Sequence, residues 1–466
     1  MRGEQRTERA KKGFSAGGIR DMTQGSPVRL ILAFAIPLLI GNIFQQIYTM
    51  ADTMVLGRNL GGGAIAAVGS TSSLYSLLLD FAMGMNSGYG IVVTRHFGAR
   101  DESGMRQAVA GMILLNLAVT AALTVLSLLF LRPLMRAMNT PEAVFTQAYL
   151  YIAILCGGML ATICYNMFSA ILRAAGDSRS PLYFLILSCI VNVALDVLLV
   201  AGLRWGVAGA AAATVIAQAV SAVLCGGYLV KRYRFLLPVK EDFRQIRPVL
   251  PDLISTGFAM ALMMCVVDLG SAVFQRANNK LGENYIAAHT ASRRIMSVMM
   301  QPLSSIAAAS SAFVGQNWGA QKRERIRLAL QKVLGMALCW GLFSCAAAWL
   351  FGQEMAELSI GVSDETIVKN AALSLRWHLS FFPVLGLLVC LRSSMQAMGE
   401  KRVPVLSSGI ELAMKIFAAW QLAPRMGFLG ICVAEPFAWA LMTIFLGSAY
   451  LFQIRKSLVP EAAAAL

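Results

Sequence analysis

The chain has 466 residues, of which 57% are hydrophobic and 14% charged, with a mean hydropathy of +0.65. A soluble domain has about 45–50% apolar and about 25% charged residues, so this composition excludes a soluble globular protein. The net charge of +16 would suit a nucleic-acid-binding protein, but the basic residues lie in short loops between apolar segments. That distribution is typical of a membrane protein, and we expect no nucleic-acid partner.

The first 28 residues are polar and basic, and an apolar segment without a small-residue cleavage site follows them. We therefore expect a cytoplasmic tail and a retained first span. The chain offers twelve apolar segments that can cross a bilayer core of about 30 Å, which takes about 20 helical residues. The predicted spans are 29–51, 65–91, 108–131, 146–170, 181–203, 207–230, 250–275, 285–312, 328–351, 371–391, 403–422 and 429–453.

The Lys and Arg residues of the tails and loops test this map, because adjacent loops must alternate between the two sides of the membrane. With the N-terminus inside, 27 of them lie on the cytoplasmic side and 8 on the outer side. This bias predicts a multi-pass protein in the lipid bilayer of the cell inner (plasma) membrane, with both termini cytoplasmic.

The chain contains an internal repeat. Residues 66–113 align with 287–334 at an ungapped shift of 221, and RAAGDSRSP at 173–181 aligns with QAMGEKRVP at 396–404 after a two-residue gap. Six spans per half is an even number, so the halves are predicted to be parallel repeats about an axis along the membrane normal. Such halves usually enclose a cavity, and alternating access by rocking them is the expected mechanism.

The predicted fold is an all-α integral membrane protein of twelve transmembrane helices in two six-helix bundles. The expected parts are a basic cytoplasmic tail at 1–28, an N-lobe at 29–231, a cytoplasmic linker at 232–249, a C-lobe at 250–453 and a cytoplasmic tail at 454–466. Nine cysteines are scattered singly through apolar segments, and we interpret them as buried apolar side chains rather than ligands or disulfides.

Ionisable residues inside spans are functional candidates, because each costs about 2.5–3.5 kcal/mol at mid-helix on insertion scales. In the N-terminal half these are Asp52, Asp80 and Asp196. Asn192 lies four residues before Asp196 and therefore on the same helix face. Counted along their helices, Asp196 and Thr214 reach a similar depth in the outer half of the bilayer, and Asp52 ends the first span on that side.

Two carboxylates, an amide oxygen and a hydroxyl at one depth form a hard oxygen site, which suits Na⁺ or a shared proton. The alternative interpretation of Asp52 and Asp196 is that they are packing or helix-end carboxylates satisfied by backbone and water. Thr214 has its own alternative, a hydroxyl bonded to its helix backbone. Asp80 is interpreted as structural.

The C-terminal half carries a different set of ionisable residues. They are Asp268, Arg293, Arg294, Arg376, Glu411, Lys415 and Glu435. Glu411 and Lys415 lie four residues apart in the order that suits an internal ion pair. Whether the acids Asp268, Glu411 and Glu435 take part in function is left open by the sequence.

Six segments carry a resemblance that covers nearly the whole chain. They are FAIPLLIGNIFQQIYTMADTMVLGR at 34–58, AAVG at 66–69, ILRAAGDSRSP at 171–181, NVALD at 192–196, LGENYIAAHTASRRI at 281–295 and FVGQNWGAQKRERI at 313–326. In order and spacing the chain resembles the bacterial branch of the MATE (multidrug and toxic compound extrusion) family. The resemblance implies an antiporter, without enzyme activity or a bound cofactor, that exports cationic or amphipathic drugs and metabolites with Na⁺ or H⁺ as coupling ion.

In MATE proteins the matching positions form the N-lobe cation site. They are Asp52, Asn192, Asp196 and Thr214. Gln45 resembles a drug-contacting position, with a packing hydrogen bond as the alternative, and Arg293 or Arg294 should face the cavity. The substrate cavity is thus expected to include Gln45, Asp52, Asp196 and Arg294. Some branches bind their cation in the C-lobe through acids in spans seven and ten, but span ten here has Arg376 and no acid, which favours the N-lobe.

Two other functions compete with this one. A flippase for lipid-linked oligosaccharides of the same superfamily should show a cationic cavity with several intramembrane Arg residues, and the N-terminal half has none away from helix ends. A membrane enzyme would need a nucleophile or metal site, whereas HExxH, GxSxG and P-loop motifs are absent and the histidines, at 96, 289 and 378, are far apart in sequence. We expect a monomer acting on small molecules, and the sequence does not choose between Na⁺ and H⁺.

Overall fold

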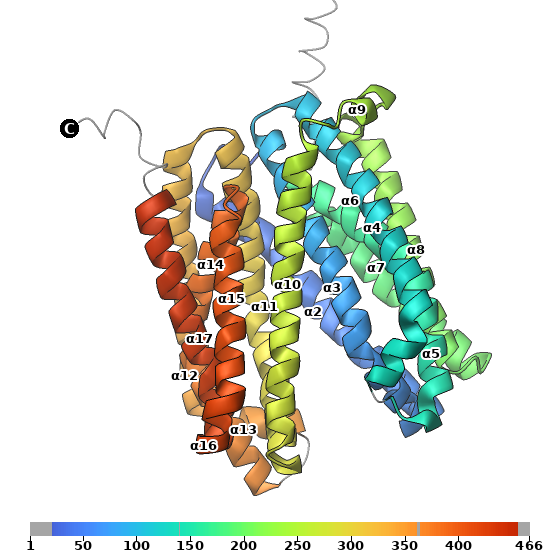
Figure 1. The fold of residues 1–466 in the computed structure, drawn as a ribbon. Coiled ribbons are helices and arrows are strands. Elements are labelled where there is room, and N and C mark those ends of the chain that lie inside the picture. Colours follow the sequence, from blue (N-terminus) through green and yellow to red (C-terminus); the bar gives the residue numbers. More distant parts are fainter. Residues whose placement is uncertain (1–20, 139, 361–363, 455–466) are drawn as a thin grey trace, which may run out of the picture. The chain divides into compact units, whose positions relative to one another are not determined.

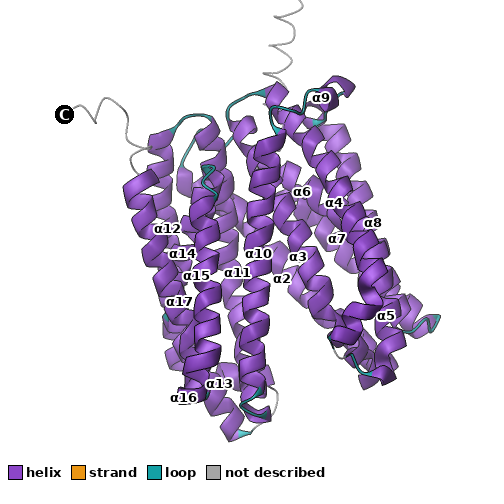
Figure 2. Ribbon diagram, viewed as in Figure 1, coloured by secondary structure: helices purple, strands orange, loops and turns teal. Residues whose placement is uncertain are grey.

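The computed structural model describes residues 21–138, 140–360 and 364–454, and every regular element in them is a helix (Figures 1 and 2). The main helices, labelled as in Figure 1, are α2 (Pro27–Leu60), α3 (Gly62–Gly98), α4 (Glu102–Ala137), α5 (Glu142–Gly157), α6 (Met159–Ala174), α7 (Arg179–Asp196), α8 (Val207–Arg232), α9 (Lys240–Arg244), α10 (Leu250–Asn279), α11 (Glu283–Gly319), α12 (Arg323–Ile360), α13 (Glu365–Ser380), α14 (Phe382–Ala397), α15 (Arg402–Phe417), α16 (Ala423–Met426) and α17 (Phe428–Ala449). Ten helical segments are long and apolar enough to cross a membrane, and two bent helix pairs bring the number of spans to twelve. The all-α membrane fold is confirmed.

Two predicted spans are not continuous helices. The fourth, expected at 146–170, consists of α5 and α6, which meet at a bend of 43°, and the tenth, expected at 371–391, consists of α13 and α14 with a bend of 48°. At the first break the Val215 side chain fills the space that a side chain on Gly158 would need. At the second, Pro383 lies in the first turn of α14, where it lacks the N–H that would continue α13. The predicted ranges of both spans hold, but the breaks inside them were not predicted, because apolar composition does not show where a helix breaks.

The chain divides into two compact units. Unit 1 consists of Ile40–Ala261 with Asp21, and unit 2 consists of Met22–Leu39 together with the residues from Leu262 onward. The division passes through α2 and α10, whereas the predicted lobe boundaries lie at the starts of these helices. Within α2 it falls two residues after Pro37.

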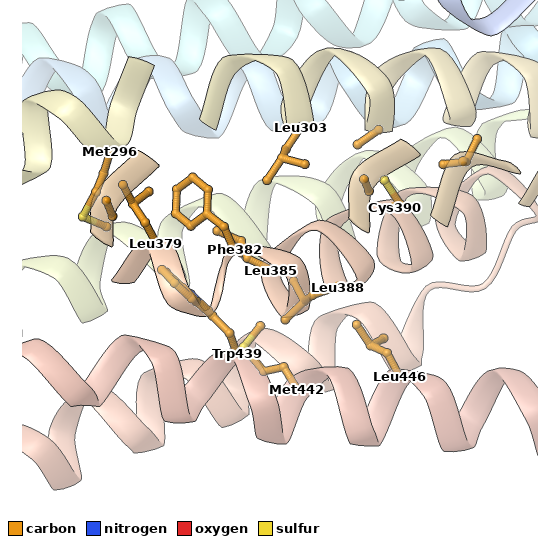
Figure 3. Packing of buried hydrophobic residues seen from close by; sticks show 14 of the residues in the cluster. Met296, Leu303, Leu379, Phe382, Leu385, Leu388, Cys390, Trp439, Met442 and Leu446 are labelled. Carbon is orange, nitrogen blue, oxygen red and sulfur yellow. The ribbon is translucent and has the colours of Figure 1, made fainter. Parts of the chain in front are cut away.

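Each unit has its own apolar core. In unit 2 the core brings together side chains of α11, α13, α14 and α17, and Figure 3 shows Phe382 beside Trp439, with ring centroids 6.2 Å apart. In unit 1, α3 and α10 approach so closely that an added side-chain carbon on Gly88 would lie 2.5 Å from the Cα of Gly257. Small residues at such contacts let membrane helices pack closely where no hydrophobic driving force acts between them.

The internal repeat is visible in the turns that precede helices. Gly61 and Gly206 stand before α3 and α8 with φ of 76° and 63°, and Gly282 and Gly427, each 221 positions later, stand before α11 and α17 with φ of 111° and 58°. This left-handed conformation favours glycine, which has no Cβ to clash with the backbone. The equivalent turns give the two halves a common register.

Candidate cation and substrate sites

Asp196 ends α7 in unit 1, and a π-helical turn over Val197–Gly202 follows it directly. The side chain is fully buried, with 0% of its surface exposed. Single π turns inside helical segments are rare and occur frequently at functional sites, because the wider turn re-aims the side chains around it. The local backbone therefore singles out Asp196 among the unit 1 acids.

Asp52 of α2 meets Asp196 across unit 1. The two carboxyl groups lie within hydrogen-bonding reach of each other, and the Oδ1 atom of each has no hydrogen-bond partner among the described residues. A hydrogen bond between two carboxyl groups needs a proton between them, because two bare carboxylates at this range repel. The geometry suits one shared proton, or a small cation in its place.

Asn192 links the acid pair to α8. With its amide oriented to satisfy both ends, its nitrogen donates to Asp196 Oδ2 at 2.8 Å and its oxygen accepts from the backbone N–H of Thr214 at 3.1 Å. The Thr214 hydroxyl donates to the backbone oxygen of Ala210 at 3.1 Å, which is the alternative weighed for this residue. The structure thus brings all four predicted residues together, and their role as cation ligands stays a prediction.

Two tyrosines beside this acid cluster were missed from the sequence. Tyr48 forms a hydrogen bond with the Thr214 side chain, and Tyr48 and Tyr151 both lie within electrostatic range of Asp52 and Asp196. Tyr48 is four residues before Asp52, and this spacing places both side chains on one helix face. The proximity of Tyr48 to Asp52 could therefore have been predicted from the sequence. Tyr151 lies on α5, and nothing in its local sequence relates it to the acids.

Gln45 is exposed and lines a small cavity with Tyr48, Asn192 and Thr214, among other residues of unit 1. The volume of this cavity is about 10 Å³, which holds about one water molecule. Gln45 therefore lies beside residues of the acid cluster. Its contact with a substrate stays a prediction.

Several ionisable residues of unit 2 form a second network around the buried carboxylate of Glu435 of α17. Arg293 Nη1 lies 2.7 Å from Glu435 Oε2, and Lys415 Nζ lies 3.5 Å from Glu435 Oε1. Lys415 Nζ also lies 3.0 Å from Glu411 Oε1, which confirms the predicted ion pair. Buried charges persist only when paired, so the network has to be satisfied as a whole.

Two histidines that the sequence separates also lie beside Glu435. His378 Nε2 is 3.6 Å from Glu435 Oε2, and His289 is within electrostatic range of both residues. Their distance along the chain did not predict this proximity, which arises because α11 and α13 pack against each other in unit 2. Distance along the sequence does not show which helices become neighbours in the fold.

The remaining candidates have more local roles. Arg376 of α13 lies over the Trp349 ring, with its guanidinium carbon 5.6 Å from the ring centroid, a cation–π contact that accounts for an Arg in span ten. Arg293 and Arg294 both line a cavity in unit 2, as expected of at least one of them. Asp80 and Asp268 are half-buried on α3 and α10.

Two of the segments that carry the resemblance have structural roles. Asp177 Oδ1 accepts from the backbone N–H groups of Arg179 and Ser180 at 3.0 Å, and Oδ2 accepts from the hydroxyl of Tyr233 at 2.7 Å. Burial and the Asp177 carboxylate raise the pKa of Tyr233, so this phenol stays a donor. In unit 2, Gln316 and its neighbours bind the backbone that leads into α2, beginning with Met22 N–H at 2.9 Å.

The comparisons with known proteins agree with this architecture. The MatE family model matches residues 37–198 and 259–420, one match in each half. Of the curated relatives, the probable multidrug resistance protein YoeA of Bacillus subtilis (strain 168) is 26% identical over 92% of this chain and 94% of its own. The FAD transporter of Shewanella oneidensis is 26% identical over 71% of this chain and 74% of its own. An outward-facing structure of a multidrug resistance MATE family transporter superposes with a TM-score of 0.88 at 24% identity, covering 95% of this chain and 99% of that one.

Proposed function

Because the chain belongs to the MatE family of membrane transporters, we propose that it is an antiporter exporting cationic or amphipathic drugs and metabolites in exchange for Na⁺ or H⁺. The helices that can span a bilayer make it a multi-pass membrane protein. The Bacillus subtilis relative, a probable multidrug resistance protein, matches nearly the full length of the chain and supports this proposal. We further propose the inner membrane as its location, with both termini cytoplasmic.

The observation that carries the coupling proposal is the close approach of the Asp52 and Asp196 carboxyl groups, each of which has an oxygen without a hydrogen-bond partner among the described residues. A buried acid pair binds one monovalent cation well, because a proton or Na⁺ removes the repulsion between the carboxylates. An organic cation satisfies the same need. Drug and coupling ion therefore compete for one charge, and this competition makes their exchange obligatory.

The movement that follows from neutralising the pair involves α2. Asp52 lies in the part of this helix that belongs to unit 1, and Pro37 lies in the part that belongs to unit 2, two residues before that part ends at Leu39. Proline removes one backbone hydrogen bond and weakens the helix at that point. Once Asp52 is neutral, the outer part of α2 moves toward α7 and α8 in the proposed cycle and expels the bound drug outward.

The test is drug efflux in inverted membrane vesicles, where export from the cytoplasm is measured as uptake of a fluorescent cationic drug. An imposed Na⁺ gradient and an imposed pH gradient are compared in parallel. We expect one of them to drive uptake at least severalfold above the level without a gradient. Uptake that depends on neither gradient would contradict the antiporter, and uptake that needs added ATP would assign a different transport class.

A further inference from the structure

Unit 2 contains a cavity of about 650 Å³, a size that suits a drug-sized molecule. Its wall is divided in chemistry. Apolar side chains, with Met296, Phe382 and Trp439 among them, line one part. Charged side chains line another, and they are Arg293, Arg294, Arg392, Glu411, Lys415 and Glu435. A ligand that fits both parts has an apolar body and a charged group.

The carboxylates of this wall are already engaged. Glu435 uses one oxygen for Arg293 at 2.7 Å and the other for Lys415 at 3.5 Å, and Glu411 pairs with Lys415 at 3.0 Å. The side chains of Glu435 and Lys415 are 5% and 3% exposed. Two cations thus balance the two carboxylates that line the cavity, so neither Glu411 nor Glu435 is left unpaired for an added organic cation.

Two further cations face the cavity without such balance. Arg294 forms no ion pair with any residue that the structure describes, and Arg392 donates a hydrogen bond to the Ser408 hydroxyl at 3.2 Å. Glu411, which pairs with Lys415, attracts Arg392 through longer-range electrostatics without forming an ion pair with it. Four cations therefore face two carboxylates, and the wall carries two formal positive charges in excess.

The internal repeat shows that this polarity is the reverse of that in unit 1. Glu435 is the eighth residue after Gly427, where Thr214 is the eighth after Gly206, and Lys415 follows Gly399 at the distance at which Asn192 follows Gly176. In the same register, the positions of the two unit 1 acids, Asp52 and Asp196, correspond to Val273 and Ala419. The second half therefore lacks the carboxylate pair and has Lys415, which pairs with Glu411 and Glu435.

We propose that the unit 2 cavity binds the anionic group of an amphipathic molecule, a phosphate or a carboxylate, through Arg294 and Arg392, while its apolar wall holds the rest of the molecule. Guanidinium groups recognise such anions because their planar donors match two oxygens at once. Methionine and aromatic side chains accept apolar bodies of varied shape. The site goes beyond the proposed function, which needs a cation site alone.

The test uses three probes of nearly equal size with the purified full-length protein in phosphatidylcholine nanodiscs. They are 1-naphthyl phosphate, the uncharged 1-naphthol and the cationic 1-naphthylmethylamine, and their binding is measured by calorimetry. We expect the phosphate to bind at least tenfold more tightly than the other two. Arg294→Gln should weaken the binding of the phosphate about tenfold, the size expected for loss of one charge-assisted hydrogen bond.

Three variants make the outcome unambiguous. Arg294→Lys keeps the charge but loses the planar pair of donors, so its affinity should lie between those of the wild type and Arg294→Gln. Arg425→Gln, which changes a basic residue outside the cavity wall, should leave the affinity unchanged. Asp196→Asn should leave the binding of 1-naphthyl phosphate intact even if it abolishes coupled transport. Failure of the coupling site at Asp196 can therefore be distinguished from failure of the anion site in unit 2. Equal affinity for the three probes, or full affinity in the double variant Arg294→Gln with Arg392→Gln, would overturn the anion site.

One further arm identifies the source of the anion. Nanodiscs that contain phosphatidylglycerol present an anionic lipid headgroup to the same cavity. Competition by this lipid with 1-naphthyl phosphate would assign the site to a membrane lipid, and unchanged probe affinity would assign it to a soluble amphipathic anion. Either result supports an anion site, because the two results differ only in whether the bound anion is a lipid headgroup or a soluble molecule.

Discussion

A single substitution at Asp196 tests the coupling proposal most directly. Asp196→Asn keeps the shape of the side chain and removes the charge that Na⁺ or a proton would neutralise, and Asp52→Asn does the same for its partner. We expect each variant to lower gradient-driven drug uptake in inverted vesicles to the level of vesicles without the protein, at normal expression. The control is Glu365→Gln, because this exposed acid pairs only with Lys369 at the surface. Gradient-driven uptake retained in either acid variant would refute the site.

A second residue-scale prediction concerns stability. The Tyr233 hydroxyl donates to Asp177 inside a buried cluster that starts α7. Tyr233→Phe removes the donor and leaves the ring in place. It should therefore lower the free energy of unfolding by about 1 kcal/mol, the size expected for loss of one buried hydrogen bond. Thermal unfolding followed by fluorescence should show a lower Tm. Tyr183→Phe, at an exposed position of α7, should leave Tm unchanged.

Residue types and spacings predicted the acid cluster well, because a four-residue spacing fixes which side chains share a helix face. That rule joins Asn192 to Asp196 without any knowledge of the fold. It does not extend across helices. Tyr151 and the pair of His289 and His378 were missed, since their positions depend on which helices pack together.

At the scale of the element, the contact between α3 and α10 depends on glycine. A side-chain carbon on Gly88 would lie 2.5 Å from the Cα of Gly257 and 2.6 Å from the backbone oxygen of Thr256, and backbone cannot rotate away as a side chain can. Gly88→Ala should therefore separate the two helices and lower the thermal stability of the protein by several degrees. On the same helix, Gly69 has no atom within 4 Å of an added side-chain carbon. Gly69→Ala is the matched control, and a similar Tm for the two variants would contradict the close packing.

Helix breaks mark the limit of prediction at this scale. The apolar length of each span follows from the thickness of the bilayer, and each of the twelve predicted segments overlaps a candidate spanning helix or a bent helix pair of the structure. The bends at Gly158 and Phe381 and the π turn after Asp196 depend on neighbouring side chains and on backbone hydrogen bonding. Hydropathy averages over such features.

For the whole molecule, the loop-charge bias predicts which loops face the cytoplasm. A cysteine in place of Arg244, on the exposed side of α9, should resist an impermeant thiol reagent in intact cells, and one in place of Glu365, at the start of α13, should react. The nine native cysteines are first replaced, because Cys339 is exposed. Both introduced cysteines should react once the membrane is permeabilised. The reverse pattern in intact cells would refute the predicted orientation.

The exchange mechanism makes a prediction about equilibrium binding that needs no gradient. If an organic cation and the coupling ion share the charge of Asp52 and Asp196, raising the concentration of that ion must weaken the binding of the drug, and by linkage the drug must weaken the binding of the ion by the same factor. With H⁺ as coupling ion, the affinity for a fluorescent cationic drug falls as the pH is lowered, because the proton occupies the acid pair. With Na⁺ as coupling ion, the affinity falls as the Na⁺ concentration is raised at constant pH and ionic strength.

The measurement is fluorescence titration of the purified protein over a grid of pH and Na⁺ values, with choline chloride replacing NaCl. In Asp196→Asn one carboxylate remains without its partner, so the dependence on the coupling ion should flatten along with the loss of affinity. Drug affinity that stays constant across the grid, or that keeps its full ion dependence in Asp196→Asn, would show that drug and ion bind at separate places and that exchange is coupled by some other contact.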